Sequence, residues 1–142
     1  MLRTAVMTAG VGVMLATAPA LAATEKFTAD LTAAAETPAT TSTGTGKLTA
    51  TLNTKTKRLS WVITYKGLTG KATAAHFHGP AKVGANAAPV VPITTKLTSP
   101  IKGYKTLTAG QISDLEAGLW YFNIHTAKYP NGEIRGQVEK AK

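Results

Sequence analysis

The chain has 142 residues and a formal net charge of +9, from 16 lysines and arginines against 7 aspartates and glutamates. It contains no cysteine, which excludes a disulfide framework, a cysteine-ligated blue-copper centre and a thiol nucleophile. The lysines are scattered singly or in pairs without an arginine-rich block, so the basic charge does not indicate nucleic-acid binding. The charge favours solubility and protection of sheet edges, with attraction to an anionic envelope surface or a small anion as the alternative.

The N-terminal segment, residues 1–22, has the pattern of a secretory signal peptide. Arg3 precedes an apolar stretch from Ala5 to Leu21, and Ala20-Leu21-Ala22 fits the small-x-small cleavage rule. We therefore expect a periplasmic or secreted protein whose single mature domain comprises residues 23–142. Retention of the segment as a membrane anchor is the alternative, and no later segment is apolar enough to span a bilayer.

After this segment, apolar residues alternate with polar ones at a period of two, and turn residues interrupt the pattern at short intervals. Such alternation predicts an all-β domain. The expected strands are residues 27–33, 48–52, 59–65, 72–78, 89–93, 119–125 and 133–139. Pro89 and Pro92 place 89–93 at a sheet edge, because proline cannot donate to a ladder. We expect a single Greek-key sandwich or barrel of about seven or eight antiparallel strands.

One short helix and one tight turn interrupt the strands near the C-terminus. Thr108 and Gln111 have capping-box spacing, and Gly118 follows as a terminator, so a helix is predicted between them. Asn131-Gly132 is a strong signal for a hairpin turn between the last two strands.

Three histidines, His76, His78 and His125, are the only ones in the chain, and all lie in predicted strands. Residues two apart on a strand point to the same side with their β-carbons about 7 Å apart, so His76 and His78 share a face. Imidazole is a common ligand for zinc and Cu(II), and three such nitrogens leave a coordination position open. The pattern predicts a metal site with nitrogen and oxygen ligands, and we expect copper to be its preferred ion, ahead of zinc.

The parity of the strands places these histidines away from the main core. Apolar residues alternate with His76 and His78 in the first strand, and with Tyr121, Asn123 and His125 in the later one. A buried structural histidine is therefore a weaker explanation, whereas three unrelated exposed histidines remain the plain alternative to a shared metal site.

Three motifs resemble the CHRD domain, named after chordin: Ala75-His76-Phe77-His78-Gly79-Pro80, residues 120–126 (WYFNIHT) and residues 129–137 (YPNGEIRGQ). The likeness extends from about Lys26 to Glu139. It implies a secreted β-domain and brings no catalytic mechanism with it. Growth-factor antagonism is not carried over, because this chain has one such unit and none of chordin's cysteine-rich modules.

A second, fold-level likeness is to copper-zinc superoxide dismutases, which combine a β-barrel, a His-x-His strand and an arginine near the C-terminal end. The usual zinc-ligand cluster and disulfide are missing here, so only a copper-only variant is conceivable. In such an enzyme Arg135 would be the catalytic residue that attracts superoxide, with the surrounding lysines steering it.

Three further residues could support the metal site. Glu133 could accept the second ring N–H of a ligating histidine or serve as an oxygen ligand, while Asn123 and Tyr121 share the face of His125. The plain alternatives are an ion pair between Glu133 and Arg135, and a structural bond from Asn123 to the loop after Gly79. No serine motif or carboxylate pair indicates hydrolysis.

These observations favour an exported metal-binding protein over an enzyme. Copper binding or handling through the three histidines is the first hypothesis. Copper-dependent superoxide dismutation is the enzymatic alternative, and a metal-free interaction module of the envelope or extracellular space is the structural one.

Overall fold

The computed structural model describes residues 23–142. The expected signal peptide, residues 1–22, lies outside the described residues. Within residues 23–142 there is no helix long and apolar enough to cross a membrane.

The described chain forms eight strands and one helix, which confirms the predicted all-β class. The strands are β1 (Thr24–Thr32), β2 (Thr45–Asn53), β3 (Arg58–Lys66), β4 (Ala72–His78), β5 (Pro89–Pro92), β6 (Ile101–Thr106), β7 (Trp120–Thr126) and β8 (Ile134–Lys140). The helix, α1 (Ala109–Glu116), precedes β7. Strand β6 was not predicted, because its sequence, IKGYKT, has a single buried residue, Ile101, among lysines and a glycine.

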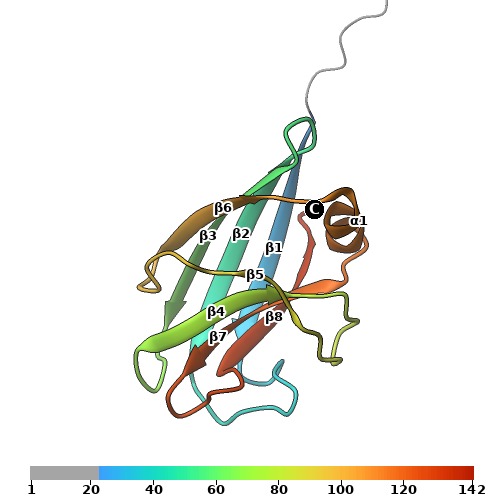
Figure 1. Ribbon diagram of the computed structural model, residues 1–142. Coiled ribbons are helices and arrows are strands. Elements are labelled where there is room, and N and C mark those ends of the chain that lie inside the picture. The colour runs from blue at the N-terminus through green and yellow to red at the C-terminus, as the bar shows by residue number, and fades with distance from the viewer. Residues whose placement is uncertain (1–22) are drawn as a thin grey trace, which may run out of the picture.

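All strands belong to one antiparallel sheet in the order β5-β4-β7-β8-β1-β2-β3-β6. Figure 1 shows β4 and β7 crossing in front of β1, β2 and β3, so the sheet curls back on itself into a nearly closed barrel. The proline-flanked strand β5 lies at one edge of the sheet, as predicted, and β6 lies at the other.

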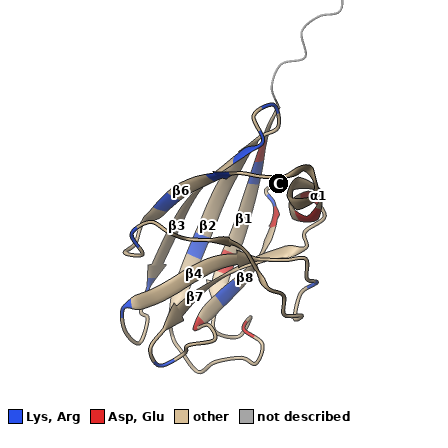
Figure 2. Ribbon diagram, in the orientation of Figure 1, with Lys and Arg blue, Asp and Glu red and all other residues tan. Residues whose placement is uncertain are grey.

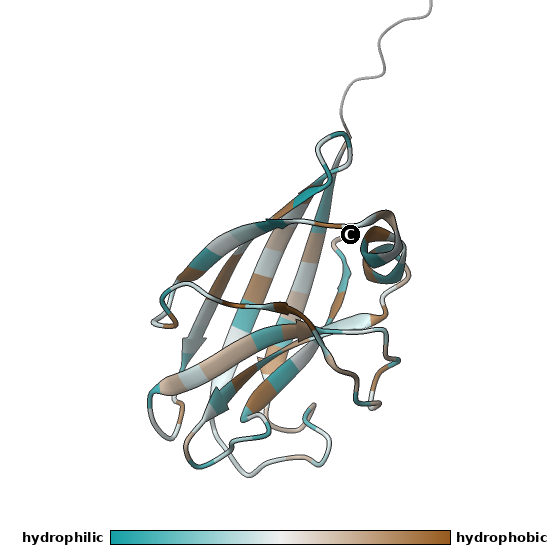
Figure 3. Cartoon of the chain, in the orientation of Figure 1, coloured by the Kyte–Doolittle hydropathy of each residue, from teal (hydrophilic) through white to brown (hydrophobic). Residues whose placement is uncertain are grey.

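The core fills the inside of this curled sheet. Inward residues alternate with exposed ones along β1, β2 and β3, as the banding in Figure 3 also shows. Aromatic side chains join the two walls: the rings of Trp61 on β3 and Phe77 on β4 lie 5.2 Å apart, and Phe77 lies 4.9 Å from Phe122 on β7. Because these rings are nearly or fully buried, apolar burial fixes the register of the strands that carry the histidines.

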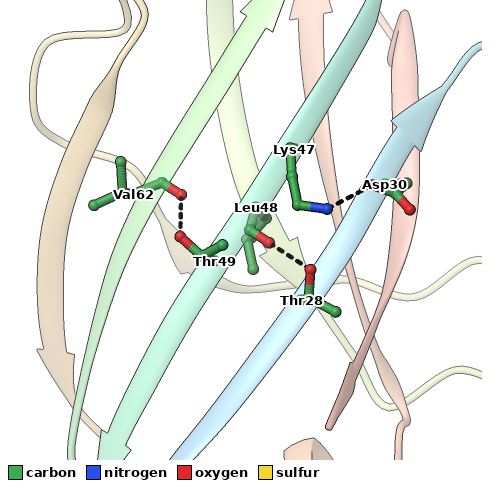
Figure 4. Close-up of polar contacts among 6 residues, drawn as sticks. All are labelled: Thr28, Asp30, Lys47, Leu48, Thr49 and Val62. Carbon is green, nitrogen blue, oxygen red and sulfur yellow. Dashed lines mark hydrogen bonds and ion pairs between the residues drawn. The ribbon is translucent and has the colours of Figure 1, made fainter. Parts of the chain in front are cut away.

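The outside of β1, β2 and β3 is mostly polar, with Val62 as an exposed apolar residue on β3. Hydrogen bonds link neighbouring strands there, from the Thr28 hydroxyl to the Leu48 carbonyl oxygen at 3.1 Å and from Lys47 to Asp30 at 3.3 Å (Figure 4). The Lys47–Asp30 ion pair is well exposed and contributes little to stability. Figure 2 shows basic residues on several strands and turns rather than in one patch.

The predicted helix and hairpin turn are both present. Thr108 caps α1 through a reciprocal bond with Gln111, and Gly118 follows the helix with a φ of 71°. In the turn between β7 and β8, the N–H of Gly132 donates to the Tyr129 carbonyl oxygen at 3.1 Å.

Strand β7 departs from the alternation of the other strands because all seven of its residues are buried. Trp120, Phe122 and Ile124 face the core. The opposite side is contacted by the loops after β1 and β4 and by the β7–β8 turn, through bonds that reach Glu36, Ala87 and Pro130. A second, polar buried region therefore lies outside the barrel core; it contains His78 and His125, and His76 beside them is half-buried.

Candidate metal centre

Two adjacent strands bring the three histidines together. On β4, His76 pairs with Asn123 of β7 and His78 pairs with Tyr121, while His125 lies two residues further along β7. One ring nitrogen from each histidine can be chosen so that the three atoms lie within 4.8 Å of one another, and the group could therefore hold a metal ion. The structure thus gathers the three residues that the strand pattern placed on one face.

Two of the rings are oriented by backbone carbonyl groups. Nδ1 of His78 donates to the Ala87 oxygen at 2.8 Å, and Nδ1 of His125 donates to the Pro130 oxygen at 2.8 Å. A carbonyl oxygen can only accept, so Nδ1 must carry the proton in both rings. In the neutral rings Nε2 therefore has a free lone pair, which is the state a metal ligand needs.

These lone pairs converge on one point beside Asn123. The Oδ1 atom of Asn123 lies 3.0 Å from Nε2 of His78 and 2.9 Å from Nε2 of His125. His76 can satisfy one of these nitrogens, because its Nδ1 lies 3.1 Å from Nε2 of His125. His78 Nε2 and Asn123 Oδ1 then face each other as two acceptors with no proton between them.

His76 and His78 resist protonation, which would otherwise relieve this conflict. Burial lowers the pKa of His76, and the neighbouring His125 and His78 lower it further. Burial also lowers the pKa of His78, and it outweighs the opposing hydrogen bonds to Ala87 and Asn123. At neutral pH these two rings are uncharged, so the cluster presents unprotonated nitrogens to a cation.

Tyr121 lies between a histidine and Arg135. Its ring stacks on His78 with centroids 4.6 Å apart and planes 5° apart, and the guanidinium carbon of Arg135 lies 3.4 Å from the centre of the Tyr121 ring. Arg135 is 2 % exposed and donates to Asn86 Oδ1 and to the carbonyl oxygen of Ala85. Arg135 thus anchors the loop that carries Ala87, the partner of His78.

Glu133 is fully buried and its carboxylate binds hydroxyl and amide groups rather than a histidine. It accepts from Ser42 Oγ at 2.6 Å, from the N–H and hydroxyl of Thr69 at 2.8 Å each, and from the Thr126 hydroxyl. Burial alone would raise its pKa, but these hydrogen bonds outweigh burial and hold the pKa below its usual value. The ion pairs within residues 23–142 join Lys47 to Asp30 and Lys140 to Glu25, and no Glu133–Arg135 pair forms in this part of the chain.

The structure adds Glu36 to the site, a residue whose role the strand pattern did not reveal. It is 7 % exposed, and its Oε1 is buried without a hydrogen-bond partner. Burial raises the pKa of Glu36 to about 7, although Arg135 and Asn123 act in the opposite direction. Glu36 shares a pocket of about 430 Å³ with His78, Asn123 and His125.

The raised pKa of Glu36 predicts a specific pH dependence of stability in the metal-free protein. A carboxyl group whose folded-state pKa lies above its unfolded value stabilises the fold at low pH, and this contribution is lost as pH rises from about 4.5 to 7. We expect Glu36→Gln to be more stable than the wild type above pH 7, by up to about 3 kcal/mol. Chemical denaturation of both proteins across this range measures the difference; parallel profiles would contradict the prediction.

Comparison with known proteins identifies one family. The family model of the CHRD domain matches residues 27–138, which include both histidine strands and the loop with Glu36. No curated protein and no solved structure matches the chain significantly.

Proposed function

The chain belongs to the CHRD domain family, and from its histidine cluster we propose that it binds copper as Cu(II) through His76, His78 and His125. The observation that carries this proposal is the convergence of unprotonated acceptors. His78 and His125 direct their Nε2 lone pairs at Asn123 Oδ1, and a cation bound between these atoms would make the arrangement favourable.

The donor set supports copper before zinc. Nitrogen and oxygen are the donors available here, since the chain has no cysteine and its methionines, Met1, Met7 and Met14, all precede Ala23. Imidazole suits both metals, and the general order of affinity for a given site puts Cu(II) above Zn(II). We propose a type-2-like Cu(II) centre, with zinc as the competing ion.

The proposed cellular role depends on the compartment to which the protein is exported. The signal-like residues 1–22 support an exported protein, in the periplasm or outside the cell. There it would bind or handle copper.

A copper titration tests the proposal. After treatment with a chelator, the protein comprising residues 23–142 should bind one equivalent of Cu(II), whereas a triple His76/His78/His125→Ala variant of unchanged circular dichroism should bind none. Competition with Zn(II) in the same titration establishes the preferred ion. Equal binding by the two proteins would refute the histidine site, and a metal-free interaction module would then become the favoured function.

Superoxide dismutation is the second candidate, supported by the pocket that gives a small molecule access to His78 and His125. Arg135 is poorly suited to attract superoxide, because it is 2 % exposed and hydrogen-bonded to Asn86 and Ala85. We therefore rank this activity below copper binding. A xanthine-oxidase-coupled assay of the copper-loaded protein tests it, with the triple histidine variant as the control.

A further inference from the structure

Asn123 occupies the middle of the histidine cluster rather than its margin. It lies on β7 between two partner strands, opposite His76 on β4 and opposite Arg135 on β8. The side chain is 3 % exposed, and its Oδ1 lies 3.0 Å and 2.9 Å from the Nε2 atoms of His78 and His125. An amide oxygen in this place can donate to a metal ion beside the imidazole nitrogens, because Cu(II) accepts mixed nitrogen and oxygen ligand sets.

The distances agree with ligands that share one ion. Two donor atoms, each about 2.0 Å from a metal, lie roughly 2.8–3.3 Å apart when they are neighbours in the coordination sphere. The two Asn123 contacts fall in this range, and so does the 3.1 Å between His76 Nδ1 and His125 Nε2. The widest nitrogen separation, up to 4.8 Å, exceeds the roughly 4 Å spanned by ligands on opposite sides of an ion, so one ring must turn slightly on binding.

Glu36 and Gly132 enclose the other end of the Asn123 amide. A β-carbon at Gly132 would collide with the Glu36 carboxylate and would lie 2.7 Å from Asn123 Nδ2. Gly132 also has a φ of 124°, which side-chain-bearing residues rarely adopt. The absence of a side chain there lets the carboxylate approach the amide nitrogen.

The two orientations of an asparagine amide are chemically different. A carboxylate accepts hydrogen bonds, so it favours the orientation in which Nδ2 faces Glu36 and Oδ1 faces the histidines. In the reverse orientation the NH2 group would donate to the Nε2 atoms and compete with a metal. Glu36 is 7 % exposed, its Oε1 is buried without a hydrogen-bond partner, and a hydrogen bond with Asn123 contributes to its pKa, so the carboxylate can face the Asn123 amide.

We propose that Asn123 Oδ1 is the fourth ligand of the metal and that Glu36 is the positioning residue which turns this oxygen toward the three histidines. The proposal rests on the histidine metal site proposed above and makes it a three-nitrogen, one-oxygen centre. Such a donor set binds Cu(II) and Zn(II) and disfavours Cu(I), which prefers soft sulfur ligands. The centre would therefore retain copper in its oxidised form.

Variants of the two residues test this arrangement in Cu(II)-loaded protein. We expect Asn123→Leu to lower Cu(II) affinity by at least about 10-fold and to change the copper hyperfine splitting in electron paramagnetic resonance, because an oxygen ligand is lost. Asn123→Asp keeps an oxygen donor and should restore both. Glu36→Gln should shift the spectrum and weaken binding by about 10-fold, because glutamine accepts either amide orientation. Glu116→Gln, at an exposed position of α1, is the matched control.

A measurement on the unmutated protein covers the case in which Asn123→Leu does not fold. Protein labelled with ¹³C at the asparagine side-chain carbonyl should show a strong ¹³C hyperfine coupling to Cu(II), absent from the unlabelled protein. Its absence, or an unchanged spectrum in folded Asn123→Leu, would overturn the role of Asn123. If copper binding depends on the histidines but not on Asn123, only this inference fails. If the triple histidine variant still binds copper, the metal site itself fails.

Discussion

Replacing His125 by alanine should weaken Cu(II) binding by more than about 100-fold, since the loss of a directly bound ligand should exceed the 10- to 100-fold cost of losing a residue that only supports one. His125 is the central ring of the cluster, with Nε2 3.1 Å from His76 Nδ1 and 2.9 Å from Asn123 Oδ1. Its removal leaves only the ring nitrogens of His76 and His78 as imidazole ligands, and no hydrogen bond of residues 23–142 joins those two rings. Competitive titration against a chelator of known copper affinity measures the change.

Two further proteins separate ligand loss from loss of fold. Lys128→Ala changes an exposed residue three positions away and should bind copper as the wild type does. His76→Ala removes the more exposed ring and should weaken binding to a similar degree, because it too removes one of the three proposed nitrogen ligands. The fold should tolerate this change, because the hydrogen bond of the His76 ring within residues 23–142 joins its Nδ1 only to His125. Unaltered affinity in folded His125→Ala and His76→Ala would rule out a shared centre.

Replacing Glu133 by glutamine should destabilise the protein by about 2–4 kcal/mol, because several hydrogen bonds to a buried charged acceptor are replaced by a neutral amide with one oxygen. Its carboxylate joins the segments that contain Ser42, Thr69 and Thr126. The hydrogen bonds hold the pKa of Glu133 below its usual value. The contribution of the Glu133 carboxylate to the free energy of unfolding is therefore fully present when the pH is above the usual pKa, and it is lost as the pH falls through the lower pKa of the folded state. Stability of Glu133→Gln should therefore fall less steeply in acid.

Denaturant unfolding at several pH values measures both effects. Glu139→Gln is the matched control, because Glu139 lies on the same strand, β8, and is exposed. We expect this control to remain within about 0.5 kcal/mol of the wild type. A Glu133→Gln protein as stable as the control would mean that the carboxylate does not hold the three segments together.

The strands that carry the histidines could be predicted because their pattern is local. Alternation in 72–78 and 119–125 identified the core side through Phe77 and Phe122, and the remaining parity placed the histidines together. What the alternation could not predict was that this second face would be covered. The loops after β1 and β4 close over it through long-range contacts, such as the bond from Asn86 to the Thr37 carbonyl oxygen.

The sequence pattern did not predict the surroundings of two residues, Glu36 and Glu133. Glu36 lies in a loop rich in alanine and threonine, where no periodicity indicates that a carboxylate will be buried beside Asn123. Glu133 and Arg135 have the same parity and suggested an ion pair, but β8 begins at Ile134. Glu133 therefore lies outside the alternation, directly after Gly132 with its φ of 124°, and its side chain binds Ser42 and Thr69 instead.

Pulsed electron paramagnetic resonance of the protein loaded with one equivalent of Cu(II) tests the histidine centre most directly, because it detects the remote nitrogen of each coordinated imidazole. The proposed centre predicts modulation from three imidazoles in the wild type, from two in His76→Ala, and none in the triple His76/His78/His125→Ala variant. A wild-type spectrum without imidazole modulation, or one that the triple variant reproduces, would contradict it.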